Sequence, residues 1–478
     1  MADILLTHSY FLRFDPKQFR AGTPYAPLAT LFAAAVLKQK GYTVAFKDNM
    51  FAQRADETAP VIEQHRPQLF VIYDDGFNYL TKMCLTNMRD AAFEMIQLAK
   101  KAGCVVAISS SDSTDHAEDY LSKGADYVIA GEGEQTLLEL ADYVVKKNGN
   151  IDNINGLIYL KSGSVVHTPK RENLRELDTL PLPAWELIDI IPYKKMWMEH
   201  KGFFSINMAT TRGCPFKCNW CAKPIYGNRY NSRSPENVIS EIKLLKEKFQ
   251  IQHIWFADDI FGLKPGWVKH FAELVQKEKL SFKFKIQSRV DLLLEEDNIR
   301  NLAIAGCDEV WVGAESGSQK ILDAMDKGTK VEQIEQATLL MKQHHIHPCF
   351  FLQFGYPGEN VEDIKNTISM VEKLLPHDIG ISVSYPLPGT KFYDNVKAQL
   401  SNKQNWTDSD ELLVMFKGTY PADFYKHLQR LVHYKFRAWK AIEAWRTAHN
   451  VKKVLSLGYR IPQIWLAQQR VKKHAAIS

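Results

Sequence analysis

The most distinctive segment of the chain reads Thr211-Arg-Gly-Cys214-Pro-Phe-Lys-Cys218-Asn-Trp-Cys221. Its three cysteines have the spacing Cys-x3-Cys-x2-Cys and follow a predicted strand directly. Thiolates are soft ligands that suit zinc or iron–sulfur clusters. A closed structural zinc site needs four ligands, and the next Cys or His after this loop is the distant His253. The spacing therefore favours a cubane cluster with one iron left open, held by Cys214, Cys218 and Cys221, over zinc or ordinary buried cysteines.

The strand before this loop begins a run of alternating strands and helices. Strands are predicted at 205–211, 252–257, 282–288, 308–313, 348–354 and 379–385, with helices at 235–249, 265–277, 295–305, 331–345 and 360–375. Such alternation predicts a parallel sheet. Six β/α units are too few for a complete eight-stranded barrel, so we expect an open (β/α)6 barrel over residues 201–400. Its chemistry should lie on loops at the carboxyl ends of the strands.

The first 150 residues alternate in the same way, which predicts a separate α/β domain with a doubly wound sheet. Its strands are predicted at 4–6, 43–46, 69–73, 105–108 and 127–130. In such sheets ligands bind at the carboxyl ends of the strands, here near residues 8, 48, 74–75, 109–111 and 131–133. Residues 151–200 contain a predicted hairpin followed by a Pro-rich linker.

The cysteine motif resembles the signature of the radical S-adenosylmethionine (SAM) superfamily. The resemblance implies that the three cysteines hold a [4Fe-4S] cluster whose open iron binds the amino and carboxylate groups of SAM. One electron from the cluster would cleave SAM and generate a 5′-deoxyadenosyl radical. The resemblance also implies an electron donor such as flavodoxin or ferredoxin, and it places Trp220 by the adenine.

Further segments resemble this superfamily in order along the chain. They are Phe256-Ala-Asp-Asp-Ile-Phe261, Gln287-Ser-Arg-Val-Asp291, Val312-Gly-Ala-Glu-Ser-Gly-Ser-Gln319, Met325-Asp-Lys-Gly-Thr329, Phe354-Gly-Tyr-Pro-Gly-Glu359 and Tyr385-Pro-Leu-Pro-Gly-Thr390. The resemblance implies that Asp258 or Asp259 faces the SAM amino group. Glu315 would bond the ribose, Lys327 would pair with the SAM carboxylate, and Arg289 would also hold SAM. Taken alone, the acidic pair would be a helix N-cap and Lys327 a solvated surface charge.

Residues 1–150 resemble the flavodoxin-like, cobalamin-binding domain that precedes many radical SAM domains. The likeness is carried by Gly124-Ala-Asp-Tyr-Val-Ile-Ala-Gly-Glu-Gly-Glu134, although Glu132 and Glu134 themselves are expected to be helix-capping or surface acids. Met50 stands where that family has the histidine that ligates cobalt, and Ser109-Ser-Ser-Asp-Ser replaces a Gly-Gly-x-His loop. The domain therefore either binds cobalamin without a protein histidine or has lost the cofactor and shapes the substrate pocket.

The chain is closest to the group of the anaerobic bacteriochlorophyll ring cyclase and the hopanoid methylases. This likeness implies cobalamin-dependent methylation of an unactivated carbon in a small, apolar polycyclic or lipid-like substrate. A cyclisation, rearrangement or desaturation driven by the same radical is the alternative. A non-catalytic iron–sulfur or corrinoid-binding protein is a third interpretation, in which the full set of SAM contacts would serve no purpose.

Charge is unevenly distributed along the chain. The net charge is +5, but the segment from Lys417 to Ser478 contains 13 Lys and Arg residues and only the acids Asp423 and Glu443. That segment therefore carries +11 and the rest of the chain −6. It lies in a predicted helical, aromatic region over 401–478. Three roles are possible for this basic segment. It could pack on the barrel as a helical cap with its lysines in water, or lie on a surface of anionic lipid. Binding of nucleic acid is the least favoured of the three.

Composition excludes several classes of protein. The apolar fraction of 45% and charged fraction of 24% are those of globular proteins, not of disordered or fibrous chains. The sequence has no apolar run of membrane-spanning length and no export signal, and its seven cysteines do not form a disulfide framework. We therefore expect a cytoplasmic protein, placed at the inner face of the membrane if the basic tail binds lipid.

Overall fold

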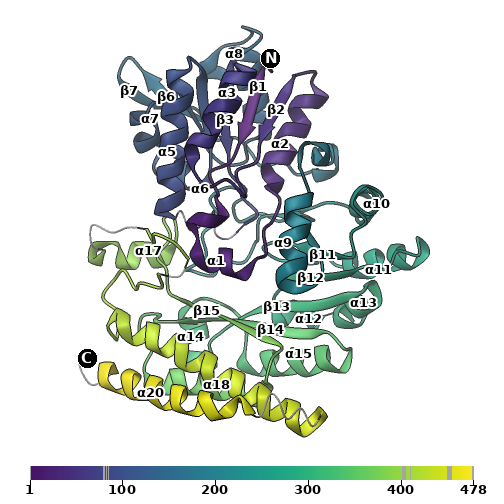
Figure 1. Cartoon of the computed structure of the whole chain (residues 1–478), viewed down its shortest axis with the longest axis vertical. Helices are drawn as coiled ribbons and strands as arrows, with labels where there is room; N and C mark the ends of the chain where they lie inside the picture. Colours follow the sequence, from purple (N-terminus) through teal and green to yellow (C-terminus); the bar gives the residue numbers. More distant parts are fainter. Residues whose placement is uncertain are drawn as a thin grey trace.

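The computed structural model of the protein describes residues 2–78, 81, 83, 85–295, 297–400, 405–409, 411–448 and 455–475. They form an α/β fold built on two largely parallel sheets and a C-terminal pair of helices. Figure 1 shows the first sheet in the upper half, the second sheet below it and the helix pair at the lower edge. In these ranges no helix is both long and apolar enough to span a bilayer.

The first sheet has seven strands in the order β2-β1-β3-β4-β5-β6-β7. Its strands are β1 (Ile4–Thr7), β2 (Val44–Lys47), β3 (Leu69–Tyr73), β4 (Val105–Ser109), β5 (Tyr127–Ile129), β6 (Leu157–Lys161) and β7 (Ser164–His167). The first five pair in parallel, as the sequence predicts, whereas β6 and β7 are antiparallel. The hairpin that the sequence places with the linker therefore extends this sheet and covers the edge of β5, which would otherwise expose unpaired backbone groups.

Helices cover both faces of this sheet, because its strands are apolar on both sides. The helices of this part of the chain are α1 (Pro16–Ala21), α2 (Leu28–Gln39), α3 (Ala59–His65), α5 (Thr86–Lys101), α6 (Ser111–Asp115), α7 (Ala117–Ser122), α8 (Glu134–Val144) and, after the linker, α9 (Ile191–Lys201). Two separate groups of buried apolar side chains result, one on each face of the sheet.

The second sheet contains the six strands that the sequence predicts, all parallel, in the order β15-β14-β13-β12-β11-β8. The strands are β8 (Ser205–Met208), β11 (His253–Phe256), β12 (Lys283–Ser288), β13 (Cys307–Glu315), β14 (His347–Phe354) and β15 (Asp378–Val383). β8 and β15 lie at opposite edges, so the sheet is a curled half-barrel and not a closed one. Alternate side chains pack against the helices, as Phe256 and Phe284 do against Phe271.

The helices that follow these strands are α10 (Pro235–Phe249), α11 (Trp267–Lys277), α12 (Val290–Leu293), α13 (Asn298–Ala305), α14 (Gln319–Ala324), α15 (Val331–Gln343), α16 (Val361–Leu374) and α17 (Lys391–Val396). A short antiparallel pair, β9 (Thr211–Arg212) and β10 (Asn231–Ser232), stands apart from both sheets. The C-terminal helices are α18 (Ala422–Ala448) and α20 (Leu457–Ala475). Helix α18 packs on α16 and β15, and α20 packs on α18.

The two sheets are joined by polar contacts between distant parts of the chain. The Asn207 side chain on β8 accepts a hydrogen bond from the Ala26 backbone N–H and donates one to its carbonyl, each at 2.8 Å. Tyr385, after β15, donates to the carbonyl of Met83 at 3.1 Å. These contacts hold the carboxyl end of the half-barrel towards the carboxyl end of the first sheet.

Candidate functional site

The three cysteines lie on a loop that β9 and β10 close at its base. Gly213 begins the loop with φ of 77°, and a Cβ there would lie 2.1 Å from the carbonyl oxygen of Arg229. Only glycine fits such a position. Cys214, Cys218 and Cys221 are half-buried and form no disulfide among the described residues, and the Cys221 N–H donates to the Cys218 carbonyl at 3.2 Å. The loop therefore turns tightly, and none of its three cysteines is fully buried.

Asp258 and Asp259, one or the other of which is predicted to face SAM, have different surroundings. The Asp258 carboxylate is buried and accepts hydrogen bonds from the Thr210 N–H at 2.7 Å, the Thr210 hydroxyl at 2.6 Å and the Thr211 N–H at 2.8 Å. Burial raises its pKa to about 6, although these hydrogen bonds oppose the shift. Asp259 is exposed and acts electrostatically on Cys214. Asp258 thus braces the start of the cysteine loop, and Asp259 is the better placed of the two to meet a ligand.

Asn219, inside the cysteine motif, ties the loop to three other segments. Its side-chain amide donates to the Ala324 carbonyl at 2.7 Å, and its side-chain oxygen accepts from the Tyr356 hydroxyl at 2.7 Å. Its backbone N–H donates to Met325, and its carbonyl accepts from Phe392. The sequence did not predict a role for Asn219, because nothing in the motif distinguishes an Asn that bonds distant segments from an Asn that faces solvent on a loop.

Cationic groups lie beside the thiols. Arg289, at the end of β12, approaches the Cys218 sulfur with its Nη1 at 3.9 Å and lies over the Phe216 ring at 3.8 Å. Asp291 binds the same guanidinium at 2.8 and 3.0 Å. Burial raises the pKa of the Cys214 thiol, while the nearby Lys223 lowers it. Positive charge next to a thiol group stabilises its thiolate, which is the form that ligates metals.

Glu315 and Lys327 meet at the carboxyl end of β13. Lys327 Nζ lies 2.8 Å from Glu315 Oε1, and both side chains are buried. Burial lowers the pKa of Lys327, but its interactions with Glu315 and with Cys218 together outweigh burial, so the pKa is raised above its ordinary value. Lys327 is therefore not the solvated surface charge that it would be if it stood alone.

The backbone around this pair is unusual. Glu315 adopts a left-handed conformation with φ of 55°, which is uncommon for a residue other than glycine and is often found at functional sites. A Cβ at Gly313 would lie 2.4 Å from Lys327 Nζ, so this glycine makes room for the pair. Lys327 Nζ also lies 6.0 Å from the centre of the Trp220 ring, and the buried Trp220 Nε1 has no hydrogen-bond partner within the described part of the chain. The structure thus brings Trp220, Glu315 and Lys327 together next to the cysteine loop.

The donor set fits a cluster held by three thiols. Throughout the ranges that the structure describes, no three His, Cys, Asp or Glu side chains are arranged around a single ion position. A cubane cluster does not require that arrangement, because each cysteine ligates a different iron. Three accessible thiols on one loop, with cations beside them, are consistent with such a cluster.

Arg212, which precedes Gly213, connects the cysteine loop to the first sheet. Its buried guanidinium forms ion pairs with Glu132 and with Glu134, the latter at 2.7 Å. The expectation that these two acids cap a helix or lie on the surface is wrong, because both are buried against Arg212. The rings of Phe77 and Tyr226 lie over the guanidinium at 5.8 and 5.1 Å. The loop after β5 is therefore joined directly to the loop that carries the thiols.

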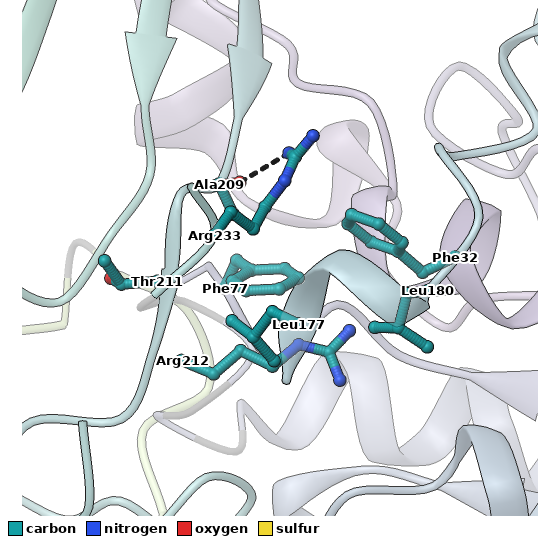
Figure 2. A pocket seen from close by; sticks show the side chains of 8 residues that line it. All are labelled: Phe32, Phe77, Leu177, Leu180, Ala209, Thr211, Arg212 and Arg233. Atoms are coloured by element: carbon teal, nitrogen blue, oxygen red, sulfur yellow. Dashed lines mark hydrogen bonds between the residues drawn. The ribbon is translucent and has the colours of Figure 1, made fainter. Parts of the chain in front are cut away.

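A small cavity lies beside Arg212, between the first sheet and the half-barrel (Figure 2). It is lined by Phe32, Phe77, Leu177, Leu180, Ala209, Thr211, Arg212 and Arg233. The space between these side chains, part of which is open to solvent, amounts to ≈ 220 Å³. Arg233 closes one side by donating to the Ala209 carbonyl at 2.9 Å. Around Arg212, the side chains between the first sheet and the half-barrel therefore pack closely and leave little room for a cofactor.

The carboxyl edge of the first sheet is polar and mostly satisfied by its own side chains. His8 bonds Asp48 at 2.9 Å, and Asp48 accepts from Tyr193 of α9 at 2.7 Å. Two buried atoms at this edge, His8 Nδ1 and Asn49 Oδ1, have no hydrogen-bond partner among the described residues. Unsatisfied buried polar atoms of this kind are compatible with a polar ligand at the edge.

The two departures from the cobalamin pattern have structural counterparts. Met50 is fully buried in the apolar core, so its sulfur does not face a ligand. Ser110 accepts a hydrogen bond from the Ser113 N–H at 2.8 Å and caps the short helix α6. Arg89 and Tyr120 bind the Asp112 carboxylate behind it. The Ser-rich segment is thus a capped helical turn and not an open glycine loop.

Comparisons with known proteins agree with this geometry. Residues 208–371 match the family model described as "Radical SAM superfamily". An uncharacterized methyltransferase of Pyrococcus horikoshii is 31% identical over 59% of this chain and 60% of its own length. The anaerobic magnesium-protoporphyrin IX monomethyl ester cyclase of Rubrivivax gelatinosus is 26% identical over 78% of this chain and 66% of its own length. The chain thus spans less than two thirds of these two relatives.

The fold also has a solved counterpart. The cobalamin-dependent S-adenosylmethionine radical enzyme OxsB, solved with aqua-cobalamin, superposes with a TM-score of 0.75 at 18% identity, covering 98% of this chain and 72% of that one. At this identity the match concerns the fold. The family match over the half-barrel shows that residues 208–371 carry a radical SAM domain, within a fold shared with OxsB.

Proposed function

We propose that the protein is a radical SAM enzyme that uses a [4Fe-4S] cluster to cleave SAM and start chemistry at an unactivated carbon. The observation that carries this proposal is the meeting of the three-thiol loop with the buried Glu315–Lys327 pair at the carboxyl ends of the strands. Cys214, Cys218 and Cys221 would hold the cluster. The bound cluster would supply the electron for SAM cleavage, drawn from a donor such as flavodoxin or ferredoxin.

The remaining residues of the site would bind and orient SAM. Lys327 would neutralise its carboxylate, since the lysine is charged and directed towards the loop. Glu315 would accept from the ribose hydroxyls, and Asp259 would face the amino group. Trp220 would lie along the adenine, with its unsatisfied Nε1 available to a ligand acceptor. Arg289 would offset the negative charge of the cluster beside Cys218.

For the first sheet we propose a flavodoxin-like, cobalamin-binding domain over residues 1–150, followed by the linker, the half-barrel over 201–400 and the helical region over 401–478. Three observations support it: the strand order 2-1-3-4-5, which is that of flavodoxin-like sheets, the two unsatisfied atoms at its carboxyl edge, and the fold shared with OxsB. Bound cobalamin would supply a methyl group to the substrate. No protein side chain is placed to ligate cobalt at the Met50 position.

The reaction class that we favour is methylation of a carbon in a small, apolar polycyclic or lipid-like substrate. The relative from Pyrococcus horikoshii is described as a methyltransferase. Cyclisation is the second candidate, because the relative from Rubrivivax gelatinosus is a cyclase. We place the protein in the cytoplasm.

Anaerobic reconstitution tests the proposal. The protein is loaded with iron and sulfide, incubated with SAM and a strong reductant, and assayed for 5′-deoxyadenosine. A parallel sample is loaded with hydroxocobalamin and examined by visible absorption. A reconstituted cluster that yields no 5′-deoxyadenosine with SAM overturns the enzyme assignment. A colourless protein after cobalamin loading refutes the methylation reaction but leaves the cyclisation candidate standing.

Replacing Lys327 with methionine should weaken SAM binding about 10- to 100-fold, because a hydrogen bond to a charged group is worth roughly 1.5–3 kcal/mol. The matched control is Lys320→Met, which breaks a half-exposed pair with Asp363 on the surface. Equilibrium dialysis of SAM against the reconstituted proteins measures the effect, with cluster absorbance as a check on folding. Equal SAM affinity of the two variants would show that Lys327 does not bind the ligand.

A further inference from the structure

The C-terminal helix α20 presents an unusual outer face. Within Leu457–Ala475, all of which the structure describes, only Ala467 is buried. Figure 1 shows α20 at the lower edge of the molecule with α18 between it and the half-barrel. Helix α18 buries Phe424, Leu428 and Val432 in the core, whereas α20 packs chiefly on α18. The side of α20 that faces away from α18 is therefore turned to solvent.

Large apolar side chains gather on that side. The exposed fractions are 73% for Leu455, 55% for Tyr459, 62% for Ile461, 60% for Trp465 and 50% for Leu466. Within α20, Tyr459 and Leu466 are seven residues apart and Ile461 and Trp465 are four apart, so they form two adjacent rows on one helix side. Leu455 lies two residues before the helix. We call these four residues, together with the preceding Leu455, the outer face of α20.

Exposed apolar side chains are more concentrated in and between the C-terminal helices α18 and α20 than elsewhere in the described chain. Of the fourteen large apolar residues that the described chain exposes, six lie between Trp445 and Leu466. Contiguous apolar patches on a protein surface mark binding sites, whereas single exposed residues are ordinary. The outer face therefore requires a partner.

Basic residues accompany the outer face. Arg470, Lys472 and Lys473 follow it on the last turns of α20 and are exposed, as is Arg446 at the end of α18. The segment from Lys417 to Ser478 carries +11. A partner must therefore offer both an apolar phase and negative charge.

We propose that the outer face of α20 binds the surface of a bilayer that contains anionic lipid, with the helix lying in the interface. Tyr459 and Trp465 have the amphipathic rings that are enriched at this depth, and Ile461 and Leu466 would enter the acyl region. Arg470, Lys472 and Lys473 would meet the headgroups. The helix is a surface element and not a span, since no described helix is apolar enough to cross a bilayer.

Other partners fit less well. A second copy of the chain in a two-fold dimer would place the same strongly basic surface against itself. A nucleic acid would take up the charge but would leave Leu455, Ile461 and Leu466 in water. Only a lipid surface satisfies both features. Binding there would set the half-barrel next to the membrane, with the first sheet on the side away from it (Figure 1).

Vesicle sedimentation with the full-length protein, without cofactors or SAM, tests the proposal separately from the catalytic function. Vesicles of phosphatidylcholine alone are compared with vesicles of phosphatidylcholine and phosphatidylglycerol. The protein should sediment with the mixed vesicles and much less with the neutral ones. Replacing Arg470, Lys472 and Lys473 with glutamine should reduce the partition coefficient roughly 100-fold.

Two matched controls separate this binding from general charge and apolar effects. The variant Ile461→Gln/Trp465→Gln should also lose binding, whereas Leu339→Gln, at an equally exposed apolar site on α15, should not. Glutamine at the exposed Lys269, Lys277 and Lys279 should leave the partition coefficient unchanged. Equal sedimentation with both vesicle types, or lipid-free dimerisation that is lost in the Ile461→Gln/Trp465→Gln variant, would overturn the proposal.

Discussion

Replacement of Cys218 by alanine is expected to remove the cluster and SAM cleavage together. Cys218 is the middle thiol of the loop, and its sulfur is the one that Arg289 approaches at 3.9 Å. With two thiols left on the loop, a cubane cluster would have two open irons and would be lost or degraded during reconstitution. Iron and sulfide content should fall to background, and 5′-deoxyadenosine should not form.

The matched control is Cys104→Ala. Cys104 is a buried free thiol directly before β4, in the core of the first sheet and away from the cysteine loop. It should keep full iron content, with only the modest loss of stability that follows from removing one buried sulfur. A Cys218→Ala protein that retains its cluster absorption or its SAM cleavage would contradict the assignment of the three ligands.

The alternation of strands and helices, including all six strands of the half-barrel, could be predicted from the sequence. Strands such as β12 and β14 are buried against helices on one face, so their residues are apolar in a pattern that the sequence shows directly. The first strand of the half-barrel was predicted to run to residue 211 but ends at Met208. Pairing with β11 stops there because Asp258 accepts the N–H groups of Thr210 and Thr211, which are then not available to the neighbouring strand.

Contacts between distant segments could not be predicted. Glu132 and Glu134 follow a strand and precede a helix, where acids usually cap or face water. Their burial depends on Arg212 of β9, which lies 80 residues after Glu132 and 78 residues after Glu134 in the chain. The resemblance to radical SAM proteins implied that Glu315 and Lys327 bind SAM. It did not predict that the two side chains form an ion pair with each other. Local patterns carry no information on such partners.

Replacement of Arg212 by methionine is expected to destabilise the protein by about 3–5 kcal/mol, because it leaves the carboxylates of Glu132 and Glu134 buried without a counter-charge. Urea unfolding of the apo protein, followed by tryptophan fluorescence, measures the loss. The surface control is Lys373→Met, which breaks an exposed pair with Glu335 and should cost at most about 1 kcal/mol.

A triple variant separates the charge effect from packing. Adding Glu132→Gln and Glu134→Gln to Arg212→Met removes all three charges, and the stability should return most of the way to that of the native protein. A triple variant less stable than Arg212→Met alone would show that the ion pairs are not the source of the loss.

The same variants test whether Arg212 positions the cysteine loop or only stabilises the fold. Arg212 is joined to Cys214 through Gly213, which packs so closely on Arg229 that a Cβ there would lie 2.1 Å from its carbonyl oxygen. A shift of the guanidinium away from the first sheet would therefore move the base of the loop. If Arg212 acts by position, the triple variant should be stable yet lose iron faster than the native protein when a chelator is added. If it acts only through stability, the triple variant should retain its iron as the native protein does, while Arg212→Met alone should not.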